Sequence, residues 1–166
     1  ASDVYKRQTV GNAEKAQACL AAGAHHALNY RDTDFEADIR EATQGAGVDV
    51  ILDMVGGRYI NKNIRLLAVN GRLVQIAFLE GSKAEIDALP IMTKRLSFTG
   101  STLRPRSDED KGAIAQSLAD KVLPLMEQGQ CLPRIHAVFP LARANEAHAL
   151  MESSAHIGKI MLQVQA

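Results

Sequence analysis

Two apolar stretches decide the fold: Val48-Asp49-Val50-Ile51-Leu52-Asp53-Met54-Val55-Gly56-Gly57 and Gly71-Arg72-Leu73-Val74-Gln75-Ile76-Ala77-Phe78. Each runs through β-branched and aliphatic residues and stops at glycine or at polar residues, and segment 59–69 between them has helical spacing. Long aliphatic runs without strict alternation are typical of strands buried on both faces, as parallel sheets require. The stretches therefore predict a parallel strand-helix-strand unit, whose strand ends are where a nucleotide would lie.

The same alternation continues on both sides of this unit. Toward the N-terminus, Asn12 is positioned to cap a helix over 13–22, a strand over 26–30 follows, and Thr33 with Glu36 has the form of a capping box for the next helix. Toward the C-terminus the pattern predicts a helix at 89–95, a strand at 96–101, a helix at 107–128 bent at Pro124, a strand at 135–139, a helix at 142–153 and a strand at 159–164. Alternating strands and helices with short links predict an α/β protein with a doubly wound parallel sheet.

The start of the chain does not suit such a sheet. A dinucleotide-binding unit normally opens with a strand and a G-x-G-x-x-G turn, and this sequence contains no such motif. We therefore expect a Rossmann-like domain truncated at its N-terminus. Residues 1–8 are interpreted as a non-native leader, residues 9–130 as the partial dinucleotide-binding domain, and residues 131–166 as a segment that returns to a catalytic domain outside this chain.

Composition narrows the function classes. The 166 residues are 46% apolar, and 19 basic side chains balance 19 acidic ones, so nothing favours nucleic acid or an anionic membrane. No apolar run is long enough for a membrane span or has the form of a signal peptide, which predicts a cytoplasmic protein. Cys19 and Cys131 lack metal-ligand spacing, and a pairing of His148 with Glu152 is better explained as a solvated surface pair, so we predict no metal site.

The strand end before the first helix indicates which nicotinamide cofactor would fit. A carboxylate at this place bonds the ribose 2′-hydroxyl of NAD, whereas a 2′-phosphate needs its absence and a nearby cation. Segment 9–15 offers no acid at the strand end, free amides at a helix start, and Lys15 in the first turn. This pattern favours NADPH, although Lys15 could be an ordinary solvated lysine, and Tyr30 could be either an adenine-stacking ring or a core aromatic.

Six segments taken in order resemble one known family: 11–15, 22–24 with 29–31, 47–57, 71–74, 99–104 and 156–159. Together they are similar to the C-terminal half of the zinc-independent quinone oxidoreductases, the zeta-crystallin-like branch of the medium-chain dehydrogenases. The resemblance runs from about residue 9 to residue 165. It implies a metal-free, NADPH-dependent reductase of quinones or conjugated carbonyls, which transfers hydride directly from the nicotinamide.

The resemblance also implies a set of cofactor-binding residues. At the adenosine end these are Gly11, Asn12, Lys15 and Tyr30. The nicotinamide and its ribose would be lined by Val55, Gly56, Gly57, Ala77, Phe78 and Leu79. Gly158 and Lys159 match a terminal segment that returns toward the cofactor, although His156 stands where asparagine is common. No catalytic residue is assigned, and Asp53 is interpreted as a carboxylate satisfied by local amides rather than as an acid catalyst.

Two other functions were weighed against the reductase. The alternating segment 96–101 could be an edge strand that pairs with its copy in a second chain, which would make this a non-catalytic assembly module or a homodimeric enzyme. An acyl- or methyl-transferring α/β enzyme is disfavoured, because the sequence has no G-x-S-x-G elbow. In the reductase interpretation the acceptor is a quinone or an enone.

Overall fold

The computed structural model describes residues 5–164, and the predicted leader falls partly outside this range. The chain divides into two compact units, the first ending at Arg106 and the second beginning at Ser107. The boundary predicted at residue 130 separates the partial dinucleotide-binding domain from a segment assigned to a catalytic domain, and it stays a prediction.

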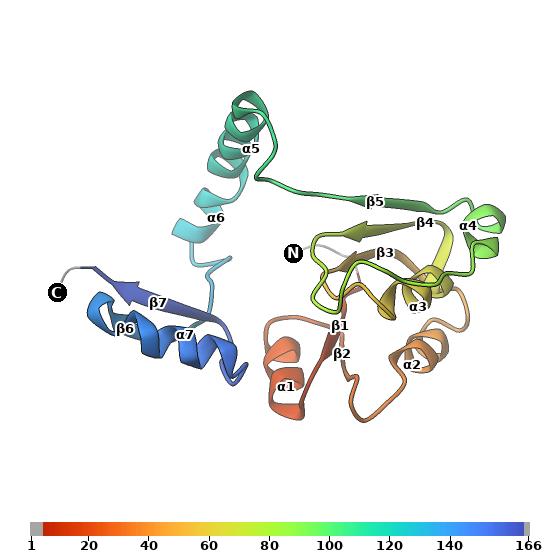
Figure 1. Ribbon diagram of the computed structural model, residues 1–166, viewed down its shortest axis with the longest axis horizontal. Coiled ribbons are helices and arrows are strands. Elements are labelled where there is room, and N and C mark those ends of the chain that lie inside the picture. The colour runs from red at the N-terminus through yellow and green to blue at the C-terminus, as the bar shows by residue number, and fades with distance from the viewer. Residues whose placement is uncertain (1–4, 165–166) are drawn as a thin grey trace. The chain divides into compact units, whose positions relative to one another are not determined.

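The strands of the first unit form two parallel sheets (Figure 1). Strand β1 (Arg7–Val10) pairs with β2 (His26–Asn29), and β4 (Leu67–Gln75) lies between β3 (Val48–Asp53) and β5 (Ser97–Gly100). All these pairings are parallel, which confirms the predicted α/β architecture. Within residues 5–164 no ladder joins the two sheets, so the expected continuous sheet is divided into β1–β2 and β3–β4–β5. Strand β1 also takes in Arg7 and Gln8, which had been placed in the leader.

The helices of the first unit are α1 (Ala13–Ala21), α2 (Phe35–Ala42), α3 (Tyr59–Leu66) and α4 (Leu89–Thr93). Asn12 caps α1 as predicted, because its Oδ1 accepts a hydrogen bond from the Lys15 amide at 2.8 Å. The cap of α2 differs from the prediction. Asp34, not Thr33, is the N-cap, and its Oδ1 accepts from the Glu36 amide at 3.2 Å.

The boundary between α3 and β4 is the largest local difference from prediction. The helix ends at Leu66 and β4 begins at Leu67, whereas the sequence pattern predicted a helix to 69 and a strand over 72–78. The Lys94 ammonium explains the early end, since it donates to the carbonyl oxygens of Arg65 and Leu67 at 2.9 and 2.7 Å. Burial in this position lowers the pKa of Lys94.

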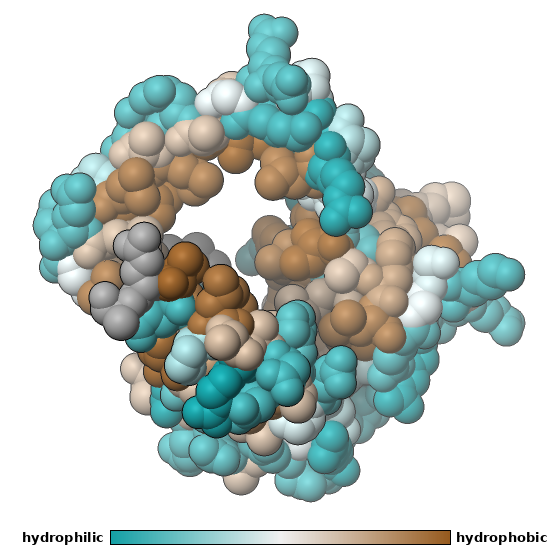
Figure 2. Space-filling view, turned by 60° about the vertical axis from the view of Figure 1, so that its left-hand side comes forward, coloured by the Kyte–Doolittle hydropathy of each residue, from teal (hydrophilic) through white to brown (hydrophobic). Residues whose placement is uncertain are grey.

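The core of the first unit lies between α2, α3 and one face of the β3–β4 pair. Its buried members form two clusters: Phe35, Ile39, Tyr59 and Leu66, and Ile60, Ile64, Leu67 and Leu73. The opposite face of β3 is open, because Val50 and Leu52 are 62% and 65% exposed. The prediction that both faces of this strand are buried is therefore wrong for the described chain. Figure 2 colours hydrophobic residues brown and shows that many of them lie on the surface.

The second unit contains a broken helix and a strand-helix-strand motif. Its elements are α5 (Asp108–Lys121), α6 (Leu123–Glu127), β6 (Ile135–Pro140), the 3-10 turn η1 (Leu141–Arg143), α7 (Ala144–Glu152) and β7 (Lys159–Gln163). Ser107 caps α5, and Pro124 lies in the first turn of α6, so the predicted bend is a break. The apolar side chains of α5 are not buried, since Ile114 and Leu118 are 39% and 50% exposed. Strands β6 and β7 pair in parallel.

Candidate functional site

The residues predicted for the adenosine end lie together where β1 and β2 finish. The Tyr30 amide donates to the Val10 carbonyl at 3.0 Å, which continues the β1–β2 ladder to the start of α1. A Cβ added to Gly11 would lie 2.9 Å from the Tyr30 hydroxyl oxygen, so the end of the Tyr30 side chain lies close against the chain at Gly11. The half-buried Lys15 stands in the first turn of α1.

A pocket of about 160 Å³ opens beside Tyr30. It is lined by Tyr30, Thr33, Phe35, Arg58, Tyr59 and Lys62. Tyr30 meets Tyr59 edge to face with ring centroids 6.4 Å apart, and Phe35 stacks on Tyr59 at 5.0 Å. This is an aromatic pocket with two cations on its wall, and such a lining suits a flat, electron-rich ring attached to an anion.

The electrostatics of the pocket follow from its partners. Lys62 donates to Asp34 at 2.8 Å, and this hydrogen bond lowers the pKa of the Asp34 carboxyl. Tyr59 is only 8% exposed, and burial raises the pKa of its hydroxyl, so Tyr59 stays neutral at physiological pH. Both cations are paired with carboxylates, Lys62 with Asp34 and Arg58 with Glu80, so the wall of the pocket sets two ion pairs beside neutral rings.

Arg58 and Tyr59 were missed by the sequence analysis. They follow Gly57 directly after the loop at the end of β3, and the rule that ligands lie at strand ends could have included them. What the sequence could not indicate was their distance from Tyr30, because that depends on how α2 packs against α3.

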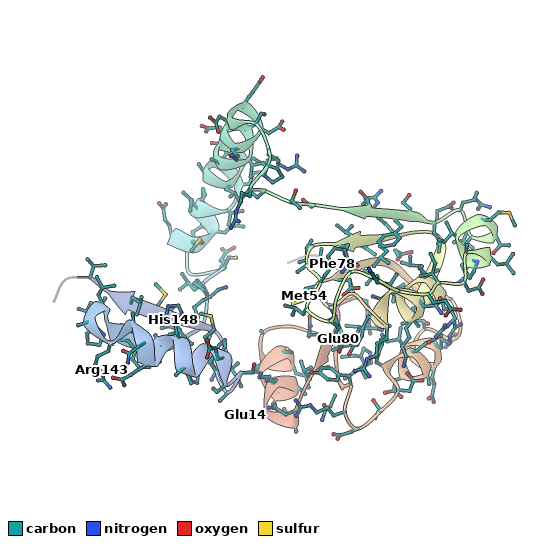
Figure 3. The ribbon with its side chains drawn as sticks, in the orientation of Figure 1. Glu14, Met54, Phe78, Glu80, Arg143 and His148 are labelled. Atoms are coloured by element: carbon teal, nitrogen blue, oxygen red, sulfur yellow. The ribbon has the colours of Figure 1, made fainter. Side chains whose placement is uncertain are left out.

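The residues predicted for the nicotinamide end form a second group, built from the loops that follow β3 and β4. The Leu79 and Glu80 amides donate to the Met54 and Val55 carbonyls at 3.1 and 2.8 Å, and the Gly57 amide donates to the Gly81 carbonyl at 2.8 Å. The ladder thus continues past the strand ends. Figure 3 shows Met54, Phe78 and Glu80 at this end of the sheet.

Two glycines make this close approach possible. Gly56 and Gly57 have φ values of 71° and 48°, and a Cβ on Gly56 would lie 2.7 Å from the Phe78 ring. Any larger residue would push the two loops apart. Phe78 and Leu79 remain 48% and 76% exposed beside them, so this end of the sheet presents an apolar surface.

The Asp53 side chain holds the loop after β3 in place through hydrogen bonds. Its Oδ1 accepts from the Val55 and Gly56 amides at 2.6 and 3.2 Å, and its Oδ2 accepts from Asn63 at 3.1 Å. The carboxylate is 3% exposed and fully engaged. The interpretation of Asp53 as a carboxylate satisfied by local amides is confirmed.

Gly158 and Lys159 belong to the second unit, and their predicted contact with a cofactor stays a prediction. A structural role is visible for Gly158, which has a φ of 104° and would overlap the Arg134 carbonyl oxygen if it carried a Cβ. The Lys159 amide donates to that same carbonyl at 2.8 Å, at the start of the β6–β7 ladder.

The described residues contain no group of three or more His, Cys, Asp or Glu side chains that could hold a metal ion. Over the same residues, no helix has both the length and the apolar character that crossing a bilayer requires. Cys19 and Cys131 are free thiols.

Comparison with known proteins identifies the family. A family model described as zinc-binding dehydrogenase matches residues 22–162. The chain belongs to this family. Among curated relatives, the quinone oxidoreductase of Sus scrofa is 31% identical over 157 residues, covering 93% of this chain and 45% of that protein. Quinone oxidoreductase-like protein 2 of Bos taurus is 28% identical over 155 residues, covering 93% and 44%.

Solved structures agree with this assignment. The Escherichia coli quinone oxidoreductase complexed with NADPH aligns with a TM-score of 0.81 at 27% identity, over 96% of this chain and 49% of that one. The chain therefore has the Rossmann-like fold of the medium-chain oxidoreductases, and the predicted resemblance to quinone oxidoreductases is confirmed. It spans about half the length of the curated relatives that it matches.

Proposed function

We propose that this chain forms part of an NADPH-dependent oxidoreductase that passes hydride to a quinone or conjugated carbonyl without a metal. The observation that carries the proposal is the start of α1, where the chain at Gly11 approaches the Tyr30 hydroxyl, Lys15 stands in the first turn of the helix and no acid ends the strand. A nearby cation and the absence of a carboxylate favour a 2′-phosphate, whereas a free ribose hydroxyl prefers a carboxylate. The quinone oxidoreductase relatives support the reaction class.

The chain's own residues would bind and orient the cofactor. The first amides of α1 and the Lys15 ammonium would hold the 2′-phosphate, and the Tyr30–Tyr59 pocket would take the purine. The apolar edge at Phe78 and Leu79 would keep water from the nicotinamide, which supplies hydride when bound. We assign no residue of this chain as nucleophile, acid or base. The predicted compartment is the cytoplasm, in keeping with two free thiols.

Replacing Lys15 with glutamine tests the phosphate assignment. We expect the whole chain to bind 2′,5′-ADP more tightly than 5′-AMP, and Lys15→Gln to weaken 2′,5′-ADP binding about tenfold, since a charge-assisted hydrogen bond contributes about 1.5 kcal/mol. Binding of 5′-AMP should not change. Isothermal titration calorimetry measures both affinities.

The exposed Lys83 provides the control for Lys15, because Lys83→Gln removes the same charge outside the proposed site. NADPH and NADH are titrated in parallel. A chain that binds NADH more tightly than NADPH, or a Lys15→Gln variant that binds 2′,5′-ADP as wild type does, would contradict the assignment.

A second role, assembly through β5, rests on a separate observation. Within residues 5–164, β5 pairs only with β4, and all four of its residues are exposed, Phe98 by 45%. An exposed edge strand offers unpaired backbone groups to a second copy of the chain. We propose a homodimer through this edge, which is compatible with the reductase function.

Light scattering on Phe98→Lys tests the dimer. We expect wild type to have the mass of two chains and the variant the mass of one, because a buried lysine would oppose its copy across the interface. Leu103→Lys, at an exposed position beyond the strand, should remain dimeric. If the wild-type chain has the mass of a monomer, this interface does not exist.

A further inference from the structure

One ion pair joins the two loops that carry the candidate site. The Arg58 guanidinium donates to both carboxylate oxygens of Glu80, from Nε at 3.0 Å and from Nη2 at 3.2 Å. Arg58 follows the loop after β3, and Glu80 lies in the loop after β4. Because the contact is bidentate, it fixes the plane of the guanidinium as well as its position.

The pair links features at the two ends of the site. Arg58 lines the pocket beside Tyr30 and Tyr59, which is proposed to take the purine. Glu80 follows Phe78 and Leu79, and its own amide donates to the Val55 carbonyl at 2.8 Å. Glu80 therefore contacts a residue of the proposed purine pocket through its side chain and the loop after β3 through its backbone.

The exposure of the pair argues against a role in stability. The Arg58 and Glu80 side chains are 73% and 40% exposed, and exposed ion pairs between flexible side chains contribute little to folding. The pair instead affects the orientation of the Arg58 guanidinium and the contact between the loops that follow β3 and β4.

We propose that Glu80 is a positioning residue for the cofactor: it holds the Arg58 guanidinium flat against the purine pocket and locks the 78–81 loop onto the 55–57 loop. This deepens the proposed function and rests on it. A guanidinium plane held in this way stacks on a purine ring, and the locked loop presents Phe78 and Leu79 in one arrangement.

The test uses Glu80→Gln in the whole chain, which keeps the size of the side chain and removes its charge. We expect NADPH and 2′,5′-ADP affinity to fall about threefold by calorimetry, with an unchanged thermal midpoint. Amide hydrogen exchange at Gly57 and Leu79 should become faster, because both amides donate across the two loops. Glu85→Gln, which removes the same charge outside both loops, should change none of these quantities.

The reversed pair Arg58→Glu with Glu80→Arg separates the two parts of the proposal. It should restore slow exchange at Gly57 and Leu79, while affinity stays reduced because the cation no longer stands at the pocket. Full recovery of affinity would show that Arg58 does not contact the purine and would overturn that part.

The outcomes also separate this proposal from the function on which it rests. If wild type does not bind 2′,5′-ADP, which needs no pyrophosphate-binding turn, the cofactor assignment fails, and the exchange rates still decide whether Glu80 locks the loops. If wild type binds and Glu80→Gln changes neither affinity nor exchange, the role of Glu80 is overturned and the cofactor assignment stands.

Discussion

Replacing Asp53 with alanine should lower the free energy of unfolding of the first unit by about 3 kcal/mol. The carboxylate accepts from the Val55 and Gly56 amides and from Asn63, and all of these contacts lie in a region where Asp53 and Asn63 are 3% and 5% exposed. Alanine would leave these donors buried without an acceptor, and each unsatisfied donor costs about 1–3 kcal/mol, with the costs not strictly additive.

Asp49 supplies the matched control for Asp53. It lies on the same strand but is exposed, so Asp49→Ala should change stability by no more than about 0.5 kcal/mol. Urea denaturation followed by tyrosine fluorescence reports on the first unit alone, since the chain has three tyrosines, Tyr5, Tyr30 and Tyr59, and no tryptophan. Equal stability of the two variants would refute the supporting role of Asp53.

Features that depend on neighbours within one turn of helix were predictable from the sequence. The caps at Asn12 and Ser107 are decided by side chains that reach an amide three residues away. The aliphatic run at 48–53 is likewise a local signal, and it forms β3 with parallel pairing as expected. Even here neighbouring candidates compete, as the cap of α2 by Asp34 instead of Thr33 illustrates.

Features that depend on distant partners were not predictable. The end of α3 is set by Lys94, which lies 29 residues beyond the Arg65 carbonyl that it binds. The open face of β3 is another case, because apolar residues such as Val50 signal a preference for burial without indicating what would cover them. Sequence periodicity describes one element at a time, and these outcomes are decided between elements.

The candidate site shows the same division. The fold rule places ligands at strand ends, and on that rule the sequence predicts a site at the ends of β1, β3 and β4. The meeting of Tyr30 with Tyr59, and the ion pair of Arg58 with Glu80, arise from loop conformations that only the structure describes. The Tyr30–Tyr59 contact forms part of the pocket, and the Arg58–Glu80 pair joins the loops that follow β3 and β4.

Gly158 was assigned to cofactor binding from the sequence, and the structure shows a role for it in the backbone of the second unit. We expect Gly158→Ala to destabilise the second unit by about 3 kcal/mol, from positive-φ strain together with a steric overlap that cannot relax easily. Gly158 has a φ of 104°, and its Cβ would overlap the backbone carbonyl of Arg134, which is the acceptor for the Lys159 amide. The overlap should therefore break the first contact between β6 and β7.

Gly129 separates strain from overlap, since it has a φ of 74° with no atom within 4 Å of an added Cβ. Gly129→Ala should cost only about 1 kcal/mol, the strain of a left-handed backbone. Far-UV circular dichroism detects the loss of the second unit, which contains no tyrosine, while tyrosine fluorescence stays unchanged. Equal effects of the two variants would show that overlap contributes nothing.

If Gly158→Ala does unfold the unit, weaker cofactor binding by that variant cannot be attributed to a lost contact. Lys159→Met, which keeps the backbone bond to Arg134, then becomes the variant that tests the terminal segment for a role in cofactor binding.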